Sequence, residues 1–331
     1  MKAFGVTDNK FTSFVEFDKS KETATGRDLL VKIEGVSINP VDIATRKNIA
    51  GELQTPKILG YDGYGIVEEI GSAVKNFQVG DKVFFAGDYT REGSYQEYEL
   101  IDERIVAHAP EKTSIEKSVA MPLVTLTASE LLYEKLHIDP AADNHERTIL
   151  IINGAGGVGS IAIQLAHLAG LRVIATASSD EKVKWVKDLG ADLVVNHHHD
   201  LIKQVHDLGI TNVDDIIGLS DNDPHWQEIV ELIKPFGTFA TITNLRESSI
   251  MDLKQKSVNF AWEWMFTKAK FNLDSMSTQG AYLEKLAAGL DQGTIKSTVT
   301  KVFNGFNLEN IKKATELVEG GHMMGKVVVK A

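Results

Sequence analysis

The chain has 331 residues, a length that suits two domains of ordinary size. Its 43% hydrophobic and 24% charged residues are typical of a soluble globular protein, and no apolar run approaches the roughly 18 residues of a membrane span. The net charge of −11 argues against a nucleic-acid partner, and the absence of cysteine excludes disulfides and thiolate metal sites. We therefore expect a cytoplasmic protein that binds neither nucleic acid nor a membrane.

The first 122 residues predict an antiparallel β domain. Short apolar segments at 30–38, 65–71 and 79–85 are separated by turns, and helical periodicity is almost absent. Pro122 then predicts the start of a helix, because proline is favoured in the first helical turn.

Strands and helices alternate from 123 to 265, as a parallel sheet with crossover helices requires. The predicted strands are 149–152, 171–176, 193–195, 216–219 and 238–242, with one helix at 226–233. The tail has helical patterns at 281–290 and 308–319 and strand patterns at 298–302 and 327–329. Because it carries no further nucleotide motif, we expect it to return to the first domain. The predicted domains are 1–122 with 266–331, and 123–265.

A glycine turn follows the strand at 149–152. Gly154, Gly156 and Gly159 fill the three glycine positions of G-x-G-x-x-G, and Gly157 and Val158 lie between them. The first glycine allows the tight turn, the second admits a pyrophosphate, and the third lets helix pack closely on strand. In this strand–turn–helix context the motif predicts a dinucleotide site at the helix N-terminus, although a purely structural turn is the alternative.

Several motifs together resemble the medium-chain dehydrogenase/reductase superfamily over essentially the whole chain. They are Gly35–Asp42, Leu59–Gly65, Val79–Val83, Gly93–Tyr98 and the glycine turn. Within it the chain looks most similar to zinc-free quinone oxidoreductases. Val195–His199 and Trp262–Thr267 resemble a bacterial branch labelled "zinc-type alcohol dehydrogenase-like". The resemblance implies an α/β fold with a GroES-like β-rich domain and a Rossmann domain with a doubly wound parallel sheet.

The same resemblance places the three catalytic zinc ligands of zinc-dependent members at about Asn39, Tyr61 and Leu123. None offers the imidazole or thiolate that zinc prefers, and the four-cysteine structural lobe is missing, so we expect no metal. The run His197–His199 follows a strand, where adjacent side chains point to opposite faces. We therefore favour a solvated or cofactor-edge role for these histidines over metal binding.

The cofactor is expected to be NADPH. Ser178 stands where NAD-selective sites carry an acidic residue, and by resemblance Lys182 and His197 approach the 2′-phosphate. Asp180 and Glu181 count against this interpretation, and Lys182 as a solvated helix residue is the alternative. The remaining cofactor residues implied by resemblance are Thr127 against the nicotinamide, Thr243 within 240–244 at the carboxamide, and Lys326 near the phosphates, with a surface lysine as its alternative.

The candidate substrate residues are Tyr61, Asn39 and Arg46. Tyr61 could donate to a developing oxyanion or be a packed aromatic, and Asp42 and Asp62 are expected to hold loops together. Trp262, Trp264 and Phe266 are predicted to alternate on one face, as core, as the edge of a homodimer, or as a lid. We expect an NADPH-dependent reductase of quinones or α,β-unsaturated carbonyls acting in an interdomain cleft; the alternative is an NADPH-binding redox sensor with little turnover.

Overall fold

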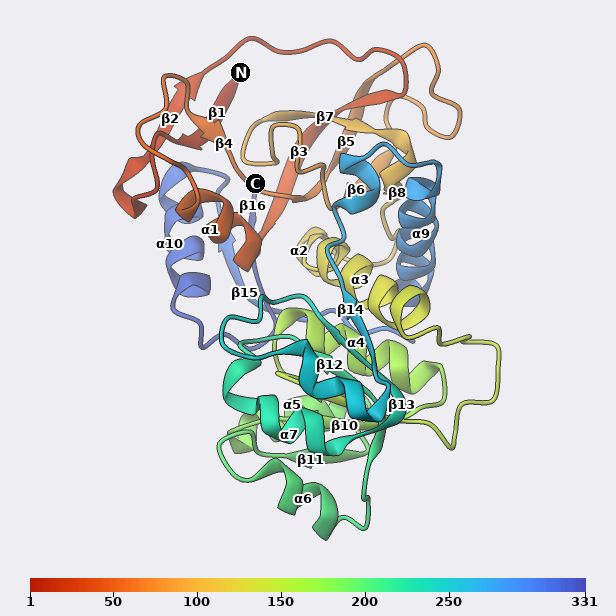
Figure 1. Cartoon of the computed structure of the whole chain (residues 1–331). Coiled ribbons are helices and arrows are strands. Elements are labelled where there is room, and N and C mark those ends of the chain that lie inside the picture. Colours follow the sequence, from red (N-terminus) through yellow and green to blue (C-terminus); the bar gives the residue numbers. More distant parts are fainter. The chain divides into compact units, whose positions relative to one another are not determined.

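The computed structural model describes all 331 residues and divides into two compact units (Figure 1). Unit 1 comprises Met1–Leu126 and Phe266–Ala331, and unit 2 comprises Thr127–Met265. The first boundary lies four residues beyond the predicted one, inside helix α3 (Pro122–Ser129), and the second lies at the predicted position. The C-terminal segment joins unit 1, as we expected from its lack of a nucleotide motif. No helix in either unit is long and apolar enough to cross a membrane.

Unit 1 is built on two sheets. One has the order β2-β1-β4, and the other has the order β15-β16-β3-β5-β6-β8, with β7 paired to β3. The strands are β1 (Lys2–Val6), β2 (Phe14–Asp18), β3 (Asp28–Ile38), β4 (Lys57–Ile58), β5 (Asp62–Ile70), β6 (Lys82–Phe85), β7 (Tyr98–Asp102), β8 (Val106–His108), β15 (Val299–Asn304) and β16 (Lys326–Lys330). The antiparallel pairing of β16 with β3, Val328 opposite Ser37, brings the chain's last strand next to the end of β3.

Six helices belong wholly or mainly to unit 1, joined by three short 3₁₀ turns. They are α1 (Pro40–Lys47), α2 (Ile115–Val119), α3, α8 (Thr267–Lys270), α9 (Ser277–Gln292), α10 (Leu308–Glu319), η1 (Phe11–Ser13), η2 (Glu103–Ile105) and η6 (Asp274–Met276). The prediction of an almost purely β first domain was wrong at α1 and α2. The signal for α1 was visible, since Asn39 and Asp42 form a capping box around Pro40 at the first helical position.

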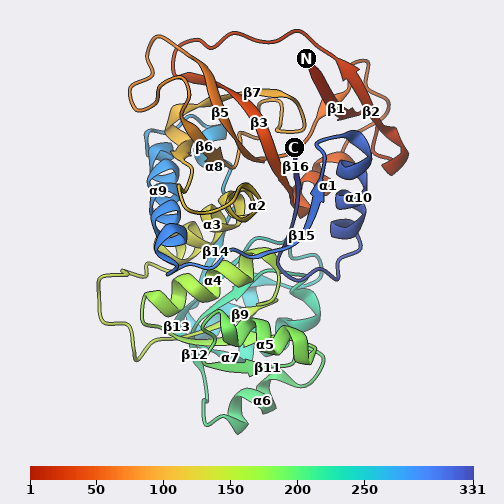
Figure 2. The same cartoon turned by 180° about the vertical axis from the view of Figure 1, so that it is seen from behind.

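Unit 2 is a six-stranded parallel sheet in the order β11-β10-β9-β12-β13-β14. Helices α4 and α5 lie on one face and α7 on the other (Figures 1 and 2). Its elements are β9 (Thr148–Ile152), β10 (Arg172–Thr176), β11 (Leu193–Val195), β12 (Val213–Gly218), β13 (Ile233–Thr241), β14 (Asn259–Trp262), α4 (Gly157–Leu168), α5 (Asp180–Asp188), α6 (Leu201–Asp207), α7 (Trp226–Leu232), η3 (Glu130–Lys135), η4 (Asp223–His225) and η5 (Ile250–Lys256). The strand order reverses between β9 and β12, and such open parallel sheets bind ligands at that switch point.

Unit 2 also buries a pair of carboxyl groups. Glu130 of η3 and Glu263, just after β14, are 2% and 3% exposed, and Lys135 Nζ lies 3.5 Å from Glu263 Oε2. Loss of hydration, followed by the charge of Glu130 and a hydrogen bond with it, raises the pKa of Glu263 to about 9. The pair therefore holds a proton at neutral pH.

A buried proton of this kind makes stability depend on pH. The pKa of Glu263 in the folded protein lies above its value of about 4.3 in the unfolded chain. The stabilisation that the protonated Glu263 side chain provides is therefore complete below about pH 4.3. It is lost as the pH rises towards 9. Glu263→Gln keeps a donor for Glu130 without a proton to lose, so its melting temperature should exceed the wild type's increasingly between pH 6 and 9. Thermal unfolding across this range checks it, with exposed Glu146→Gln as control; superimposable pH profiles for wild type and Glu263→Gln would refute it.

Candidate cofactor and substrate sites

The glycine turn joins β9 to α4 in unit 2. Asn153 adopts a left-handed conformation (φ 66°), and Gly156 is the N-cap of α4. A Cβ on Gly159 would lie 2.3 Å from the Asn153 carbonyl oxygen, and one on Gly154 would lie 2.9 Å from Ala175 Cβ. A side chain is therefore excluded at Gly154 and Gly159, and the first N–H groups of α4 remain for an anion, as a dinucleotide pyrophosphate requires.

The predicted 2′-phosphate residues lie at the carboxyl ends of β10 and β11. The Ala177 N–H donates to the Val195 carbonyl oxygen (2.9 Å), which sets Ser178 beside the segment that carries His197. Ser179 caps α5, so Lys182 lies on the first turn of that helix. Desolvation, then His198, His225 and Lys182, lower the pKa of His197. Lys182 and His197 are thus close enough to interact, and His225 joins them although no sequence motif indicated it.

The histidine run differs from our expectation in one respect. His197–His199 form a turn after β11 rather than part of a strand, so the alternating-face argument does not apply to them. The rings of His197 and His198 lie 4.4 Å apart. No group of three or more His, Cys, Asp or Glu side chains in the chain is arranged to hold a metal ion.

Residues predicted for the nicotinamide end lie on α3 and after β13. Thr127 lies in the second turn of α3. Thr243 Oγ1 donates to the Ser220 carbonyl oxygen (2.7 Å) and accepts from Asn222 Nδ2 (2.8 Å). Asn222 is completely buried, bonds Thr241 as well, and has no partner for its Oδ1. Asn222 therefore fixes the 241–243 segment. No sequence motif predicted this role for a single asparagine between strands.

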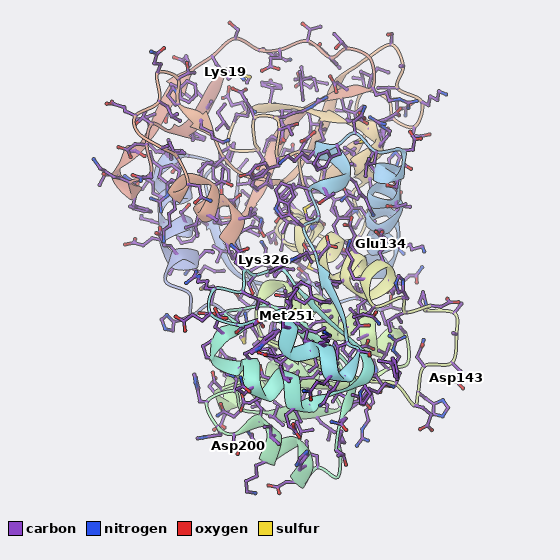
Figure 3. The ribbon with its side chains drawn as sticks, viewed as in Figure 1. Lys19, Glu134, Asp143, Asp200, Met251 and Lys326 are labelled. Atoms are coloured by element: carbon purple, nitrogen blue, oxygen red, sulfur yellow. The ribbon has the colours of Figure 1, made fainter.

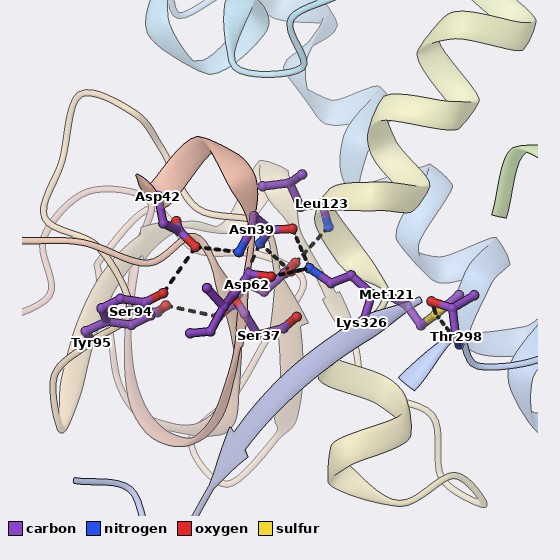
Figure 4. Close-up of polar contacts among 11 residues, drawn as sticks. Ser37, Asn39, Asp42, Asp62, Ser94, Tyr95, Met121, Leu123, Thr298 and Lys326 are labelled. Atoms are coloured by element: carbon purple, nitrogen blue, oxygen red, sulfur yellow. Dashed lines mark hydrogen bonds and ion pairs between the residues drawn. The ribbon is translucent and has the colours of Figure 1, made fainter. Parts of the chain in front are cut away.

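Unit 1 contains a buried lysine at the start of β16 (Figures 3 and 4). Lys326 Nζ donates to the Ile38 carbonyl oxygen (2.9 Å), to Asn39 Oδ1 by a short contact, and to Asp62 Oδ2 (3.3 Å). Lys326 is 4% exposed, so the alternative of a surface lysine is wrong. Its three donors are all used within unit 1, and a contact with cofactor phosphate would require this network to open.

The network includes Asn39 and Leu123, two of the three positions that correspond by resemblance to the zinc ligands of zinc-dependent members. Asp62 accepts from Asn39 Nδ2 and from the Leu123 N–H, each at 2.8 Å. Desolvation raises the pKa of Asp62, and Lys326 is the first of the groups that oppose this rise. An amide, a main-chain N–H and an ammonium thus surround one carboxylate (Figure 4). These are donors rather than metal ligands, so the residues present do not fit zinc.

Asp42 extends the same network. Its Oδ2 accepts from the Asn39 N–H (2.7 Å) and the Tyr95 hydroxyl (3.1 Å), while Oδ1 has no partner. Burial raises the pKa of Asp42 to about 7, against the hydrogen bond from the Asn39 N–H. Asp42 and Asp62 therefore hold main-chain segments together, in line with their predicted structural roles.

Of the three predicted substrate residues, Arg46 and Asn39 are held by contacts within unit 1. Arg46 is 2% exposed, and its guanidinium donates to the Asn9 carbonyl oxygen (2.8 Å) and to Glu319 on α10 (2.7 Å). Asn39 uses both ends of its amide within the Lys326 network. Both side chains therefore stabilise unit 1, and neither is a catalytic candidate.

Tyr61 is the remaining candidate. Its hydroxyl lies 3.2 Å from Thr45 Oγ1, its ring stacks on Tyr89, and it contacts Phe266 at 4.6 Å between centroids. Desolvation raises the pKa of Tyr61, with Thr45 opposing, so the phenol stays protonated at ordinary pH and can donate a hydrogen bond. Phe266 is buried in unit 1, whereas Trp262 and Trp264 are exposed in unit 2, so the predicted common face of the three aromatics was wrong.

Comparisons with known proteins agree with this architecture. Residues 25–111 match the alcohol dehydrogenase GroES-like domain, and residues 157–271 match the zinc-binding dehydrogenase family. The chain is 39% identical to a zinc-type alcohol dehydrogenase-like protein of Staphylococcus epidermidis, covering 96% of this chain and 94% of that one. It is 30% identical to the chloroplastic NADPH-dependent alkenal/one oxidoreductase of Arabidopsis thaliana (91% and 71% covered). The quinone oxidoreductase of Coxiella burnetii superposes with a TM-score of 0.83 at 27% identity (100% and 99% covered).

Proposed function

Because the chain belongs to the medium-chain dehydrogenase/reductase superfamily, we propose that it is a zinc-independent oxidoreductase that uses NADPH to reduce quinones or α,β-unsaturated carbonyls. The similarity to an alkenal/one oxidoreductase and to a quinone oxidoreductase supports this class of substrate. Oxidoreductase activity follows from the family; the choice of cofactor and substrate is our proposal.

The observation that carries the proposal is the Lys326–Asp62–Asn39 network. An unactivated alcohol must lose its hydroxyl proton as hydride leaves, and zinc enzymes assist this by lowering the pKa of the bound alcohol. Here Asn39 and the Leu123 N–H, at two of the three zinc-ligand places, donate to buried Asp62, which also pairs with the Lys326 ammonium, and no set of zinc ligands remains. Quinones and enones need no such metal, because the charge that arrives with the hydride delocalises onto oxygen.

The cofactor would be held by unit 2. The glycine turn and the start of α4 fit its pyrophosphate, Ser178, Lys182 and His197 fit the 2′-phosphate, and the Thr243 segment fits the carboxamide. When bound, NADPH supplies the hydride. The protein's part is to orient it and to stabilise negative charge on the acceptor.

Tyr61 is the proposed donor to the developing oxyanion. Its proton is retained because of burial, and Thr45 can serve as donor to the phenolic oxygen, which leaves the phenolic hydrogen for the acceptor. A donor of this kind stabilises the transition state more than the ground state.

Tyr61→Phe should slow enone reduction by about 10²-fold, because losing one oxyanion donor typically costs that much in kcat. Reduction of a reactive quinone should slow less, since its product is a more stable anion, and the Kd for NADPH should hardly change. Steady-state kinetics with both acceptors checks this.

Tyr64→Phe is the matched control, since Tyr64 is another buried tyrosine of unit 1. Equal losses for Tyr61→Phe and Tyr64→Phe would remove Tyr61 from the proposed reaction.

We also propose a homodimer formed through β14. This strand ends the six-stranded sheet with one unpaired edge, and Trp262 on it is 49% exposed. An unpaired strand edge with a large exposed aromatic is a surface suited to pairing with a second copy.

A further inference from the structure

Two imidazoles lie together beside Lys182 in unit 2. The ring of His197, in the turn after β11, and that of His225, at the end of η4, are 6.1 Å apart with their planes at 83°. His225 and Lys182 both act electrostatically on His197, so three basic side chains from three different elements converge. The segment that carries His197 lies beside Ser178, where the proposed NADPH would place its 2′-phosphate.

Glu228 on α7 determines which ring nitrogen of His225 carries the hydrogen in the neutral imidazole. His225 Nδ1 lies 2.9 Å from Glu228 Oε2, and the other carboxylate oxygen accepts from the Leu201 N–H at 2.7 Å. A carboxylate only accepts hydrogen bonds, so Nδ1 carries the hydrogen. In the neutral ring Nε2 then presents a lone pair, which repels an incoming anion.

His197 lies among basic groups. Its Nδ1 is buried without a hydrogen-bond partner. The charged and titratable groups that act on it are Lys182 on α5, His225 on η4 and His198 in its own turn, and desolvation is the largest influence lowering its pKa. A cluster of bases with one of its nitrogens left unsatisfied favours an anionic ligand.

The acidic residues of the neighbouring elements are directed elsewhere. Asp180 and Glu181, on the first turn of α5, are exposed to solvent. Asp200, at the start of α6 (Figure 3), accepts from the Lys203 N–H of its own helix at 2.9 Å. Glu228 contacts His225 from α7 and fixes its Nδ1 hydrogen. No carboxylate contact to His197 therefore competes with an anion.

We propose that the His197–His225 pair, with Lys182, binds the 2′-phosphate of NADPH and takes up a proton from solvent as it does so. The preference for NADPH over NADH then increases as the pH falls. The proton enters at an imidazole nitrogen, which changes from a lone pair to an N–H donor facing the phosphate. The 2′-hydroxyl of NADH can donate as well as accept, so NADH needs no added proton. The inference rests on the proposed use of NADPH.

The expected effect is large enough to measure. If one proton is taken up per NADPH, the ratio of the Kd values for NADH and NADPH changes by up to about tenfold per pH unit. The second pKa of a phosphate monoester is about 6, so between pH 7 and 8.5 the ligand is a dianion and contributes little of this change.

Isothermal titration calorimetry at pH 7.5, in buffers of different ionisation enthalpy, measures proton uptake directly. On binding NADPH the protein should take up a substantial fraction of a proton, and on binding NADH it should take up none. His225→Gln and His197→Gln should reduce the uptake, because glutamine donates without titrating. Lys182→Ala is the matched control, which should weaken NADPH binding yet retain the uptake. The pH dependence of the two Kd values in the unmodified protein tests the same claim without any variant.

Each outcome decides a different point. NADPH binding tighter than NADH, with no proton exchange and a pH-independent ratio, would overturn the inference and leave the cofactor proposal standing. Uptake that persists in both histidine variants would also overturn it, since the proton would then reside elsewhere. Equal affinities for NADPH and NADH at every pH would overturn the cofactor proposal, and this inference with it.

Discussion

Lys326→Met should destabilise the protein by about 3–5 kcal/mol, because it leaves Asp62 as a buried carboxylate without its cation. For a unit of this size that corresponds to a drop of roughly 10 °C in melting temperature. Methionine keeps the length and apolar stem of lysine, so the loss reports the ammonium rather than a cavity. Thermal and denaturant unfolding measure it.

Two further variants separate charge from packing. Lys330→Met alters the same strand, where the ammonium pairs with Glu116 at 2.8 Å but both side chains are part-exposed, so it should cost about 1 kcal/mol or less. The double variant Asp62→Asn/Lys326→Met removes both charges and should recover much of the lost stability. A Lys326→Met protein as stable as Lys330→Met would show that the buried network contributes little.

Lys182→Ala should weaken NADPH binding by about ten- to a hundredfold, since one charge-assisted hydrogen bond to phosphate contributes roughly 1.5–3 kcal/mol. The affinity for NADH should hardly change, because NADH has no 2′-phosphate. Titration of intrinsic fluorescence or calorimetry with both cofactors measures the two Kd values.

Lys184→Ala is a suitable control for Lys182, because it lies on the same helix and its side chain is 81% exposed in a pair with Asp188. It should affect neither cofactor. Equal losses for NADPH and NADH in Lys182→Ala, or an unmodified protein that prefers NADH, would transfer the discriminating role to Asp180.

The features that follow local rules were predictable from the sequence. The glycine turn between β9 and α4 and the helix Leu308–Glu319 appear where the patterns placed them. Ser178 and His197 come together because both follow strands of one parallel sheet, whose carboxyl ends meet at the same edge. Short-range periodicity and sheet topology therefore determine the backbone elements around the proposed cofactor site.

The contacts that depend on distant residues were not predictable in this way. Lys326 and Asn39 are 287 residues apart, and only the pairing of β16 with β3 brings them together. Asn222 and His225 lie at the two ends of η4, which is too short to show periodicity, and their roles arise from contacts with Thr243 and Glu228. Asn39 and Arg46 were predicted to contact substrate because the identity of a residue does not reveal whether its side chain is buried or already paired.

Zinc-independent reduction with NADPH is tested most directly by one assay on metal-analysed protein. After treatment with a chelator, NADPH oxidation is followed with 1,4-benzoquinone and with an enone, beside ethanol and NADP⁺. We expect far less than one zinc per chain, turnover of the quinone and enone that the chelator does not change, and no oxidation of ethanol. One zinc per chain with a chelator-sensitive rate, or rapid ethanol oxidation, would contradict the proposal; tight NADPH binding without turnover of any acceptor would also contradict it.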